Sequence, residues 1–380
     1  MLPENKQIQS FFMKIGIVVT DLFQMGGVER VVLLLSRIFC DILGHEVTIF
    51  SCLSRSGAGK LFFECPDQVK IVHLSENLDP DSRLVKNSFS QKTFLKFRVL
   101  SELKKHQKNH PHDILISTVC WCNCFVPFFA RNAKTIACEH GSFSAVPLPY
   151  RWASRLFFRF SDAAVFLTAG NAENYTFVRQ NKKFIIPNPL TFTPEKSSDC
   201  TNKRIISLTR FTHEKGNDML LTIAAKLKNI IPDWRIDVFG AGADEELLKE
   251  QAEKLDLGGF LYFNTPTANA QSELLQSSIY ILYSRSEGLP MVLLEAQACG
   301  VPAISFACTP GPGAVINDNT DGLLVPPNDT DAFVQAVVKL ANDEDLRRRF
   351  GAAAKINSQR FAPEKIAAIW QQLFDRLMQS

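Results

Sequence analysis

Short apolar runs alternate with helical stretches along the chain, and this alternation limits what the chain can fold into. Runs at residues 15–19, 69–74, 113–117, 135–139, 163–167 and 184–187 form a first series, to which the segment GHEVTIF at 44–50 also belongs. A second series starts at residue 205 and continues at 236–239, 260–264, 278–283 and 301–306. Such short runs are typical of parallel strands buried on both faces. The pattern predicts an α/β protein with parallel sheets covered by helices.

A proline-rich, polar stretch separates the two series. Pro187, Asn188 and Pro189 are followed by polar residues as far as Asn202. At 380 residues the chain is long for a single hydrophobic core. We therefore predict an N-terminal domain at residues 1–190 and a C-terminal domain at 200–362.

Composition narrows the class of protein. Ten cysteines are present, but the start MLPENKQIQSFF lacks the apolar core of a secretory signal, so reduced cytosolic thiols are expected. Met13, directly before the first apolar run, is an alternative start to Met1. No run approaches the ~20 apolar residues of a membrane-spanning helix, so we expect a soluble or peripheral protein. Residues 120, 122 and 124 are cysteines, but a second ligand pair at a zinc-like spacing is missing, and no metal site is predicted.

The stretch SRSEGLPMVLLEAQACGV, residues 284–301, contains the main candidate site. Glu287 and Glu295 stand eight apart, and Pro290 fits the first turn of a helix. The run at 278–283 puts Glu287 at the carboxyl end of a strand, where open α/β sheets bind ligands. Ionised carboxylates accept several hydrogen bonds and suit hydroxyl-rich ligands. The alternative is that these residues only complement a helix dipole.

Cationic and glycine-rich loops follow other predicted strands. Arg210 and Lys215 come after the strand at 205–208 and can direct two cations at one anionic group. Gly26 and Gly27 precede a helix, which permits close approach of a phosphate or sugar to backbone N–H groups. The alternatives are solvated loop charges and a tight turn without a ligand. His140, in CEHGSF, follows the strand at 135–139, and a single histidine there is commonly structural.

Together these motifs resemble the retaining GT-B glycosyltransferases with the Glu-x7-Glu signature, which include bacterial lipopolysaccharide, capsule and lipid-linked oligosaccharide enzymes. The resemblance covers the chain from Met13 and is densest from Arg210 to Asp329, through FTHEKG, the glutamate pair and DGLLVPPND; GGVER and CEHGSF also match. It implies two Rossmann-like domains facing across a cleft, with the helix at 363–380 packed back on the first.

The resemblance also assigns roles. Arg210 and Lys215 are expected to bind the donor diphosphate, Glu287 the sugar, Glu295 the ribose, and His140 to approach the sugar from the first domain. Further donor-binding residues are expected at Gly26, Gly27, Gly240, Gly288, Leu289, Pro290, Thr309 and Gly311, the last two before a short helix with free amides. No DxD-like metal motif is evident near the site. The resemblance therefore implies a UDP- or GDP-sugar donor as substrate, no cofactor and no metal.

Positive charge is concentrated in the first half of the chain. Residues 1–200 hold 24 Lys and Arg against 17 Asp and Glu, a net +7, whereas the remainder has 18 against 22, a net −4. Residues 83–108 and 150–160 combine basic and aromatic side chains, as in helices on an anionic membrane. The alternative is ordinary helices with solvated basic faces. Nucleic acid is not expected, because no recognised binding motif accompanies the charge.

These expectations combine into one functional prediction. The chain is expected to transfer a hexose or N-acetylhexosamine, with retention, to a glycan or glycolipid in cell-surface polysaccharide or lipid-linked oligosaccharide assembly. The expected location is cytoplasmic, peripheral on the inner membrane. A nucleotide-sugar epimerase of the same fold and a non-catalytic sugar-nucleotide or membrane-binding protein are the alternatives. Donor conversion without an acceptor distinguishes the epimerase.

Overall fold

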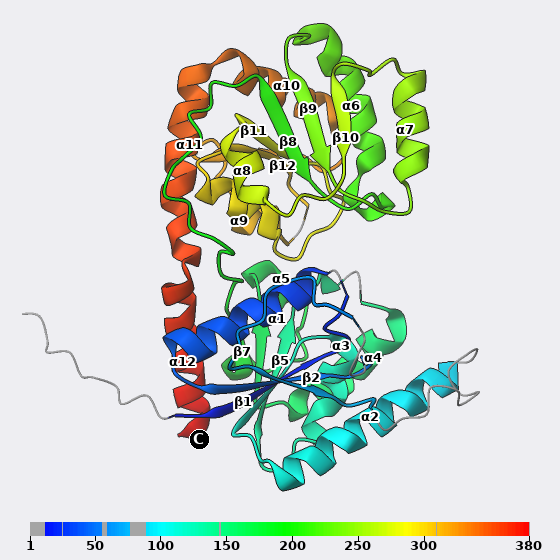
Figure 1. Ribbon diagram of the computed structural model, residues 1–380, viewed down its shortest axis with the longest axis vertical. Helices are drawn as coiled ribbons and strands as arrows, with labels where there is room; N and C mark the ends of the chain where they lie inside the picture. The colour runs from blue at the N-terminus through cyan, green and yellow to red at the C-terminus, as the bar shows by residue number, and fades with distance from the viewer. Residues whose placement is uncertain are drawn as a thin grey trace, which may run out of the picture. The chain divides into compact units, whose positions relative to one another are not determined.

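The computed structural model describes residues 12–24, 26–54, 59–76, 89–143, 146–308 and 310–379. The chain divides into two compact units (Figure 1). The N-terminal unit comprises residues 1–167, 172–189 and 363–380, and the C-terminal unit comprises 168–171 and 190–362. The C-terminal helix of the chain therefore belongs to the N-terminal unit.

The N-terminal unit is built on a parallel sheet of seven strands in the order β3-β2-β1-β4-β5-β6-β7. The strands are β1 Lys14–Val19, β2 Glu46–Ser51, β3 Lys70–His73, β4 Ile114–Ser117, β5 Lys134–Glu139, β6 Ala163–Phe166 and β7 Lys183–Ile185. The helices are α1 Gly27–Arg37, η1 Ile38–Ile42, α2 Phe89–Asn109, α3 Cys120–Phe125, η3 Val126–Phe128, α4 Leu148–Phe157, η5 Phe158–Phe160, α5 Ala169–Glu173, which begins in the other unit, η6 Gln180–Lys182 and α12 Pro363–Met378.

The C-terminal unit has a parallel sheet of six strands in the order β10-β9-β8-β11-β12-β13. The strands are β8 Arg204–Leu208, β9 Arg235–Phe239, β10 Leu261–Asn264, β11 Ile279–Leu282, β12 Ala303–Phe306 and β13 Gly322–Val325. The helices are η7 His213–Lys215, α6 Asn217–Ile230, α7 Glu245–Lys254, α8 Ala270–Leu275, α9 Met291–Ala298, η8 Pro312–Ala314, α10 Thr330–Asn342, α11 Glu344–Ser358 and η9 Gln359–Phe361.

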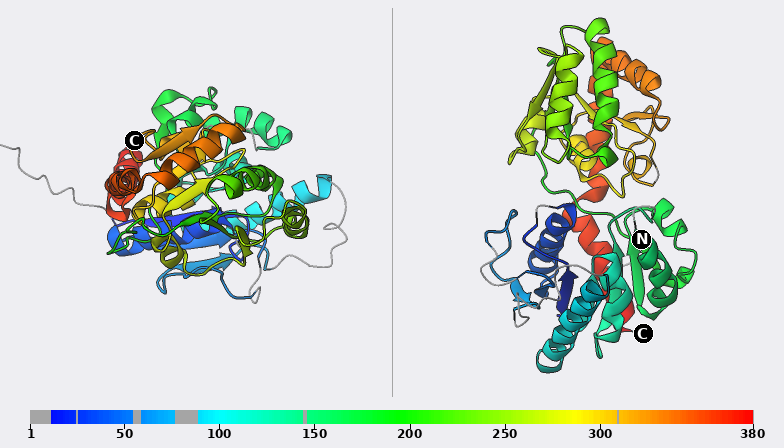
Figure 2. Two further views of the ribbon diagram at one scale, coloured as in Figure 1. Left: turned by 90° about the horizontal axis from the view of Figure 1, so that it is seen from above. Right: turned by 90° about the vertical axis from the view of Figure 1, so that its right-hand side faces the viewer.

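In each unit helices lie on both faces of the sheet (Figures 1 and 2). Central strands such as β4, β6, β11 and β12 are buried along their whole length, which explains their continuous apolar sequence. The predicted parallel α/β architecture is confirmed. The segment DGLLVPPND, to which the sequence analysis gave no secondary structure, contributes the edge strand β13.

Aromatic packing attaches the C-terminal helix α12 to the N-terminal unit. Phe39 of η1 makes edge-to-face contacts with Trp370 and Phe374, at ring-centroid distances of 5.4 and 5.2 Å. All three side chains are at most 2% exposed. His45 extends the contact by a 3.0 Å hydrogen bond with Gln371. Buried aromatic pairs of this kind add stability beyond the area they bury.

Strand order determines where loops can form a ligand site. The order reverses between β1 and β4 in the N-terminal unit, and between β8 and β11 in the C-terminal unit. In open α/β sheets, ligands usually bind beside the loops at the carboxyl ends of the strands where the order reverses. The loops that follow β8 and β11 carry Arg210, Lys215 and Glu287.

Candidate functional site

Glu287 lies in the loop between β11 and α9, as predicted. The side chain is mostly buried, at 11% exposed. Its Oε1 accepts a 2.7 Å hydrogen bond from Ser284 Oγ and another of 2.7 Å from Lys215 Nζ. Pro290 is the N-cap of α9, one residue before the helical turn in which it was predicted. The carboxylate is thus held at a fixed position at the end of the central strand.

Close packing of the loop after β8 against the loop after β11 brings Lys215 next to Glu287. Gly216, at φ +72°, is so close to the β11 end that a Cβ there would lie 2.2 Å from the carbonyl oxygen of Tyr283. Only glycine fits this conformation and this contact. Arg285 N donates to Glu214 O at 3.0 Å, and the Arg285 guanidinium forms a bidentate pair with Asp218 at 2.7 and 2.6 Å. These contacts hold in place the two loops that carry the Lys215–Glu287 pair.

Arg210 lies in the same loop as Lys215, directly after β8, and its side chain is exposed. Among the described residues none pairs with its guanidinium, so it is available to a ligand. Its backbone is fixed by the β9 loop, since Phe211 N donates to Ala241 O at 2.9 Å. Glycine is required at 240 and 242 by this packing, because Cβ atoms there would lie 1.9 Å from Thr209 O and 2.2 Å from Phe211 O. Gly240 thus has a structural role that the sequence analysis did not foresee.

The loop after β12 contacts Glu287 directly. A Cβ at Gly311 would lie 2.8 Å from the Cβ of Glu287 and 2.9 Å from its carbonyl oxygen. The predicted short helix is only the three-residue turn η8. Because Pro310 and Pro312 lack an N–H group, Gly311 and Gly313 are the amide donors of residues 310–313. Thr309 lies outside the described residues.

Glu295 lies on α9 and is 1% exposed. Its Oε1 accepts a 2.7 Å hydrogen bond from Thr191 Oγ1. Leu289 and Pro290 are buried beside the loop, and Gly288 is partly exposed. A ribose hydroxyl that reached Glu295 would therefore have to displace Thr191 or join it at the carboxylate.

His140 follows β5 in the N-terminal unit. Both of its ring nitrogens are buried, and no described residue forms a hydrogen bond with either of them. Burial lowers the pKa of His140 to about 4, so the imidazole is neutral at pH 7. A neutral imidazole with unused nitrogens can accept or donate a hydrogen bond to a ligand.

Glu139, directly before His140, is 3% exposed and was not predicted as a site residue. Its Oε1 accepts a 2.7 Å hydrogen bond from Asn123 Nδ2, and Asn123 Oδ1 accepts one of 2.6 Å from Ser117. Burial raises the pKa of Glu139 to about 7, although the Asn123 hydrogen bond opposes the shift. A buried Glu-His dipeptide at a strand end is the sequence signal for this network.

The Gly26-Gly27 loop begins α1. Gly26 is the N-cap and is extended, at φ −138° and ψ 164°. A Cβ at Gly27 would meet nothing within 4 Å, and one at Gly26 would meet the flexible carboxylate of Glu29. Backbone strain therefore does not explain why residues 26 and 27 are both glycine. The predicted approach of a ligand to these amides stays a prediction.

Comparison with known proteins identifies the family. Residues 191–357 match the family described as "Glycosyl transferases group 1". An uncharacterized glycosyltransferase of Haemophilus influenzae is 28% identical over 364 residues, which are 94% of this chain and 99% of the relative. The family match places residues 191–357 of the chain in the group 1 glycosyltransferases.

Two further comparisons extend the match. The Campylobacter jejuni "GalNAc-alpha-(1->4)-GalNAc-alpha-(1->3)-diNAcBac-PP-undecaprenol alpha-1,4-N-acetyl-D-galactosaminyltransferase" is 27% identical over 369 residues, or 95% of this chain and 98% of the relative. The crystal structure of TarM from S. aureus with Fondaparinux, alpha-GlcNAc-glycerol and UDP superposes with a TM-score of 0.77 at 14% identity, covering 96% of this chain and 100% of that one. The fold of this glycosyltransferase is accordingly GT-B, as predicted.

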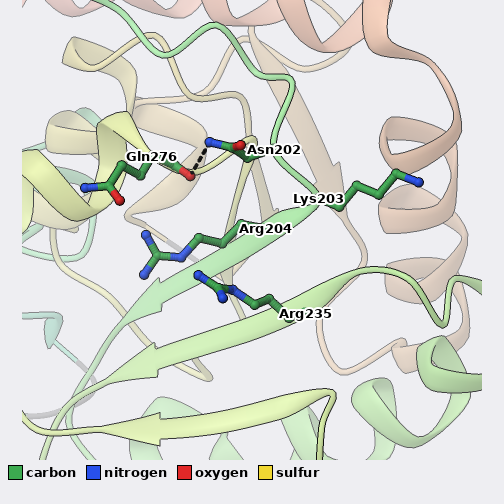
Figure 3. Close-up of a pocket in the computed structure, with 5 residues that line it drawn as sticks. All are labelled: Asn202, Lys203, Arg204, Arg235 and Gln276. Atoms are coloured by element: carbon green, nitrogen blue, oxygen red, sulfur yellow. Dashed lines mark hydrogen bonds between the residues drawn. The ribbon is translucent and has the colours of Figure 1, made fainter.

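A hollow in the C-terminal unit is lined by residues other than those of these loops (Figure 3). It measures about 350 Å³ and is lined by Asn202, Lys203, Arg204, Arg235 and Gln276. Arg204 and Arg235 begin β8 and β9, so the hollow lies at the amino ends of the strands. Arg204 is already paired with Asp237 and Glu273. This paired charge makes the hollow a poor candidate for the donor site.

The described ranges contain neither a metal-binding cluster nor a helix able to span a membrane. These residues contain no cluster of three or more His, Cys, Asp or Glu side chains arranged to hold a metal ion. The ten cysteines are all free thiols. Within the same ranges, no helix combines the length and apolar character needed to cross a bilayer.

Proposed function

We propose that this glycosyltransferase transfers a hexose or N-acetylhexosamine from a nucleoside diphosphate sugar, with retention, to a glycan or glycolipid in cell-surface polysaccharide or lipid-linked oligosaccharide assembly. The observation that carries the proposal is the Lys215–Glu287 pair, with Arg210 in the same loop as Lys215, at the point where the strand order of the C-terminal sheet reverses. Cations there suit a diphosphate, and a carboxylate suits sugar hydroxyls.

Arg210 and Lys215 hold the donor diphosphate. Departure of the nucleoside diphosphate places negative charge on its oxygens, and preorganised donors stabilise such charge as it develops. The two side chains and the amides of Gly311 and Gly313 supply donors from two loops, those after β8 and β12. This set of donors supports transfer without a metal ion. UDP is the favoured nucleotide, because the TarM structure was solved with UDP.

Glu287 orients the donor sugar while paired with Lys215. Its lone pairs beyond those used by Ser284 and Lys215 are free to accept sugar hydroxyls. Glu295 binds the ribose by replacing its contact with Thr191. His140, neutral at pH 7, contacts the sugar, and the acceptor attacks from the face that the leaving group vacates. Same-face attack gives retention without a covalent intermediate.

The acceptor is a glycolipid or a growing glycan. The Campylobacter jejuni relative supports this choice, because its name specifies an undecaprenol-linked acceptor. Such an acceptor places the enzyme on the cytoplasmic face of an anionic membrane.

A donor screen against a membrane lipid extract, read by mass spectrometry, tests the proposal. We expect one UDP- or GDP-sugar to yield a glycosylated product whose new bond, by NMR, has the donor's anomeric configuration. Activity should persist in EDTA, and Glu287→Gln should be the inactive control. An inverted product or activity restored only by Mg²⁺ or Mn²⁺ would contradict retention or metal independence. Donor conversion without acceptor would establish the epimerase instead.

A further inference from the structure

One face of α4 and η5 exposes a row of large apolar side chains. Leu148, Trp152, Leu156 and Phe160 recur every four residues and are 66%, 65%, 56% and 49% exposed. Residues four apart lie on the same side of a helix. Phe128, 46% exposed, extends the row through a ring contact of 5.0 Å with Phe160. We call these five side chains the apolar stripe.

Trp152 distinguishes the stripe from ordinary surface residues. The other three tryptophans of the chain, at positions 121, 234 and 370, are at most 7% exposed. Single exposed apolar residues are common on soluble proteins, whereas contiguous exposed patches mark interaction surfaces. Figures 1 and 2 show α4 at the periphery of the N-terminal unit, beside α3. The stripe is therefore a surface without a partner in the described chain.

The charge around the stripe is positive. Between Asp113 and Asp162 the single acidic residue in the sequence is Glu139, which is buried, whereas five residues are Lys or Arg. Exposed Arg155 lies 5.1 Å from the ring centroid of Trp152, and exposed Arg159 lies 5.0 Å from that of Phe160. Arginine beside an exposed aromatic can bind lipid phosphates while the ring enters the headgroup region.

The other basic stretch, on α2, is built differently. Lys96 lies 5.1 and 4.8 Å from the ring centroids of Trp121 and Tyr150 and donates a hydrogen bond to the Tyr150 hydroxyl. Val99, Leu100 and Leu103 are fully buried. The described part of α2 thus packs these three side chains in the core, while Phe97 is 42% exposed. Residues 83–88 of this basic stretch lie outside the described residues, so the expectation that the stretch meets a membrane stays a prediction.

We infer that the apolar stripe inserts into the interface of an anionic lipid bilayer, with Arg155 and Arg159 on the lipid phosphates. A bilayer is favoured over a second copy of the chain, because two such faces would bring like charges together. The biological purpose rests on the proposed glycolipid acceptor. The part of the stripe on α4 begins eight residues after His140 in the sequence. Arg151 Nε donates a 2.7 Å hydrogen bond to Val146 O, two residues before the start of α4. A lipid-anchored acceptor would then present its headgroup near His140.

Tryptophan fluorescence of the full chain tests the insertion directly. Phosphatidylglycerol vesicles should shift the emission to the blue, and brominated lipids should quench it, because Trp152 is the exposed tryptophan. Trp152→Phe should still bind in sedimentation but lose the shift. An unchanged spectrum in the wild type, or a full shift in Trp152→Phe, would overturn the inference. Neither readout needs a sugar donor, so lack of transferase activity would count against the proposed function alone.

Sedimentation with vesicles separates the apolar and charged contributions. Trp152→Ser with Leu156→Ser should reduce binding roughly tenfold or more, because two large apolar groups no longer leave water. Arg155→Glu with Arg159→Glu should abolish the preference for phosphatidylglycerol over phosphatidylcholine, and salt should weaken wild-type binding. Ile356→Ser, 76% exposed on α11 in the other unit, is the matched control and should bind like the wild type. Equal binding of all variants, or dimerisation that buries Trp152 without lipid, would overturn the inference.

Discussion

Lys215 Nζ lies 2.7 Å from Glu287 Oε1, and the two side chains are 15% and 11% exposed. The ion pair thus joins the loop after β8 to the loop after β11 at the reversal of strand order. A charge pair in this position has two functions. It fixes the carboxylate for a sugar, and it keeps the ammonium next to a site for phosphate. Loss of either partner leaves the other charge mostly buried and unpaired.

Alanine at Arg210 and at Lys215 should weaken nucleotide-sugar binding but differ in their effect on stability. Each removes a charge-assisted contact of about 1.5–3 kcal/mol, equivalent to at least a roughly tenfold loss of affinity. Arg210 is exposed, so its replacement should leave the free energy of unfolding unchanged. Lys215→Ala should also destabilise the C-terminal unit by about 3 kcal/mol, because Glu287 loses its partner.

Calorimetric titration with the nucleotide sugar and urea unfolding measure the two effects. Lys249→Ala is the matched control, because it breaks an exposed pair with Glu245. Such a pair contributes little, so binding and stability should both stay near those of the wild type. Unchanged affinity in Arg210→Ala and Lys215→Ala would refute their assignment to the diphosphate.

Gly311→Ala should lower kcat at least tenfold, because the new Cβ would lie 2.8 Å from the Cβ of Glu287 and displace it. Misplacement of about 1 Å at a reacting centre can cost 100-fold in rate. Gly313→Ala is a close control, since its Cβ would be 3.9 Å from the nearest atom, in Leu324. Steady-state kinetics should show near-normal turnover for this control. Similar kcat values for both variants would show that the 311 contact does not position Glu287.

The sequence predicted every described strand except β13, the loops at the carboxyl ends of the strands and the family, because these depend on local apolar patterning and on short motifs. It did not predict pairs that the fold brings together. Lys215 and Glu287 are 72 residues apart, and Thr191 and Glu295 are 104 apart. The assignment of Gly240 to donor binding stays a prediction, and the contact with Thr209 that requires glycine there was not foreseen. The basic stretches on α2 and α4 were indistinguishable by composition, and only packing separates them.

Glu287→Gln and Glu295→Gln should affect binding of the free nucleotide differently. Glu287 is assigned to the sugar, so its substitution should depress turnover while the nucleoside diphosphate alone binds normally. Glu295→Gln should weaken the nucleoside diphosphate as well, since the ribose loses a charged acceptor. Thr191→Val, which removes the hydroxyl that occupies Glu295, should leave this binding intact or strengthen it. Equal losses of nucleotide affinity in the two glutamine variants, measured by calorimetry, would contradict these roles.

Glu139→Gln should stabilise the protein increasingly as the pH rises. The folded pKa of Glu139 is about 7, above its usual 4.5, because burial disfavours the carboxylate. The unfolded chain therefore releases the proton first, and the wild type loses stability between pH 4.5 and 7, by about 3 kcal/mol in total. His140, with its pKa lowered to about 4, costs stability as the pH falls below 6.5, but it does so in both proteins and cancels in the difference.

Urea unfolding at pH 5 and pH 8 measures this difference in the free energy of unfolding between Glu139→Gln and the wild type. The difference should favour the variant more at pH 8 than at pH 5. Glu64→Gln, whose side chain is 82% exposed, is the control. A difference between Glu139→Gln and the wild type that is the same at both pH values would mean that Glu139 ionises normally in the fold.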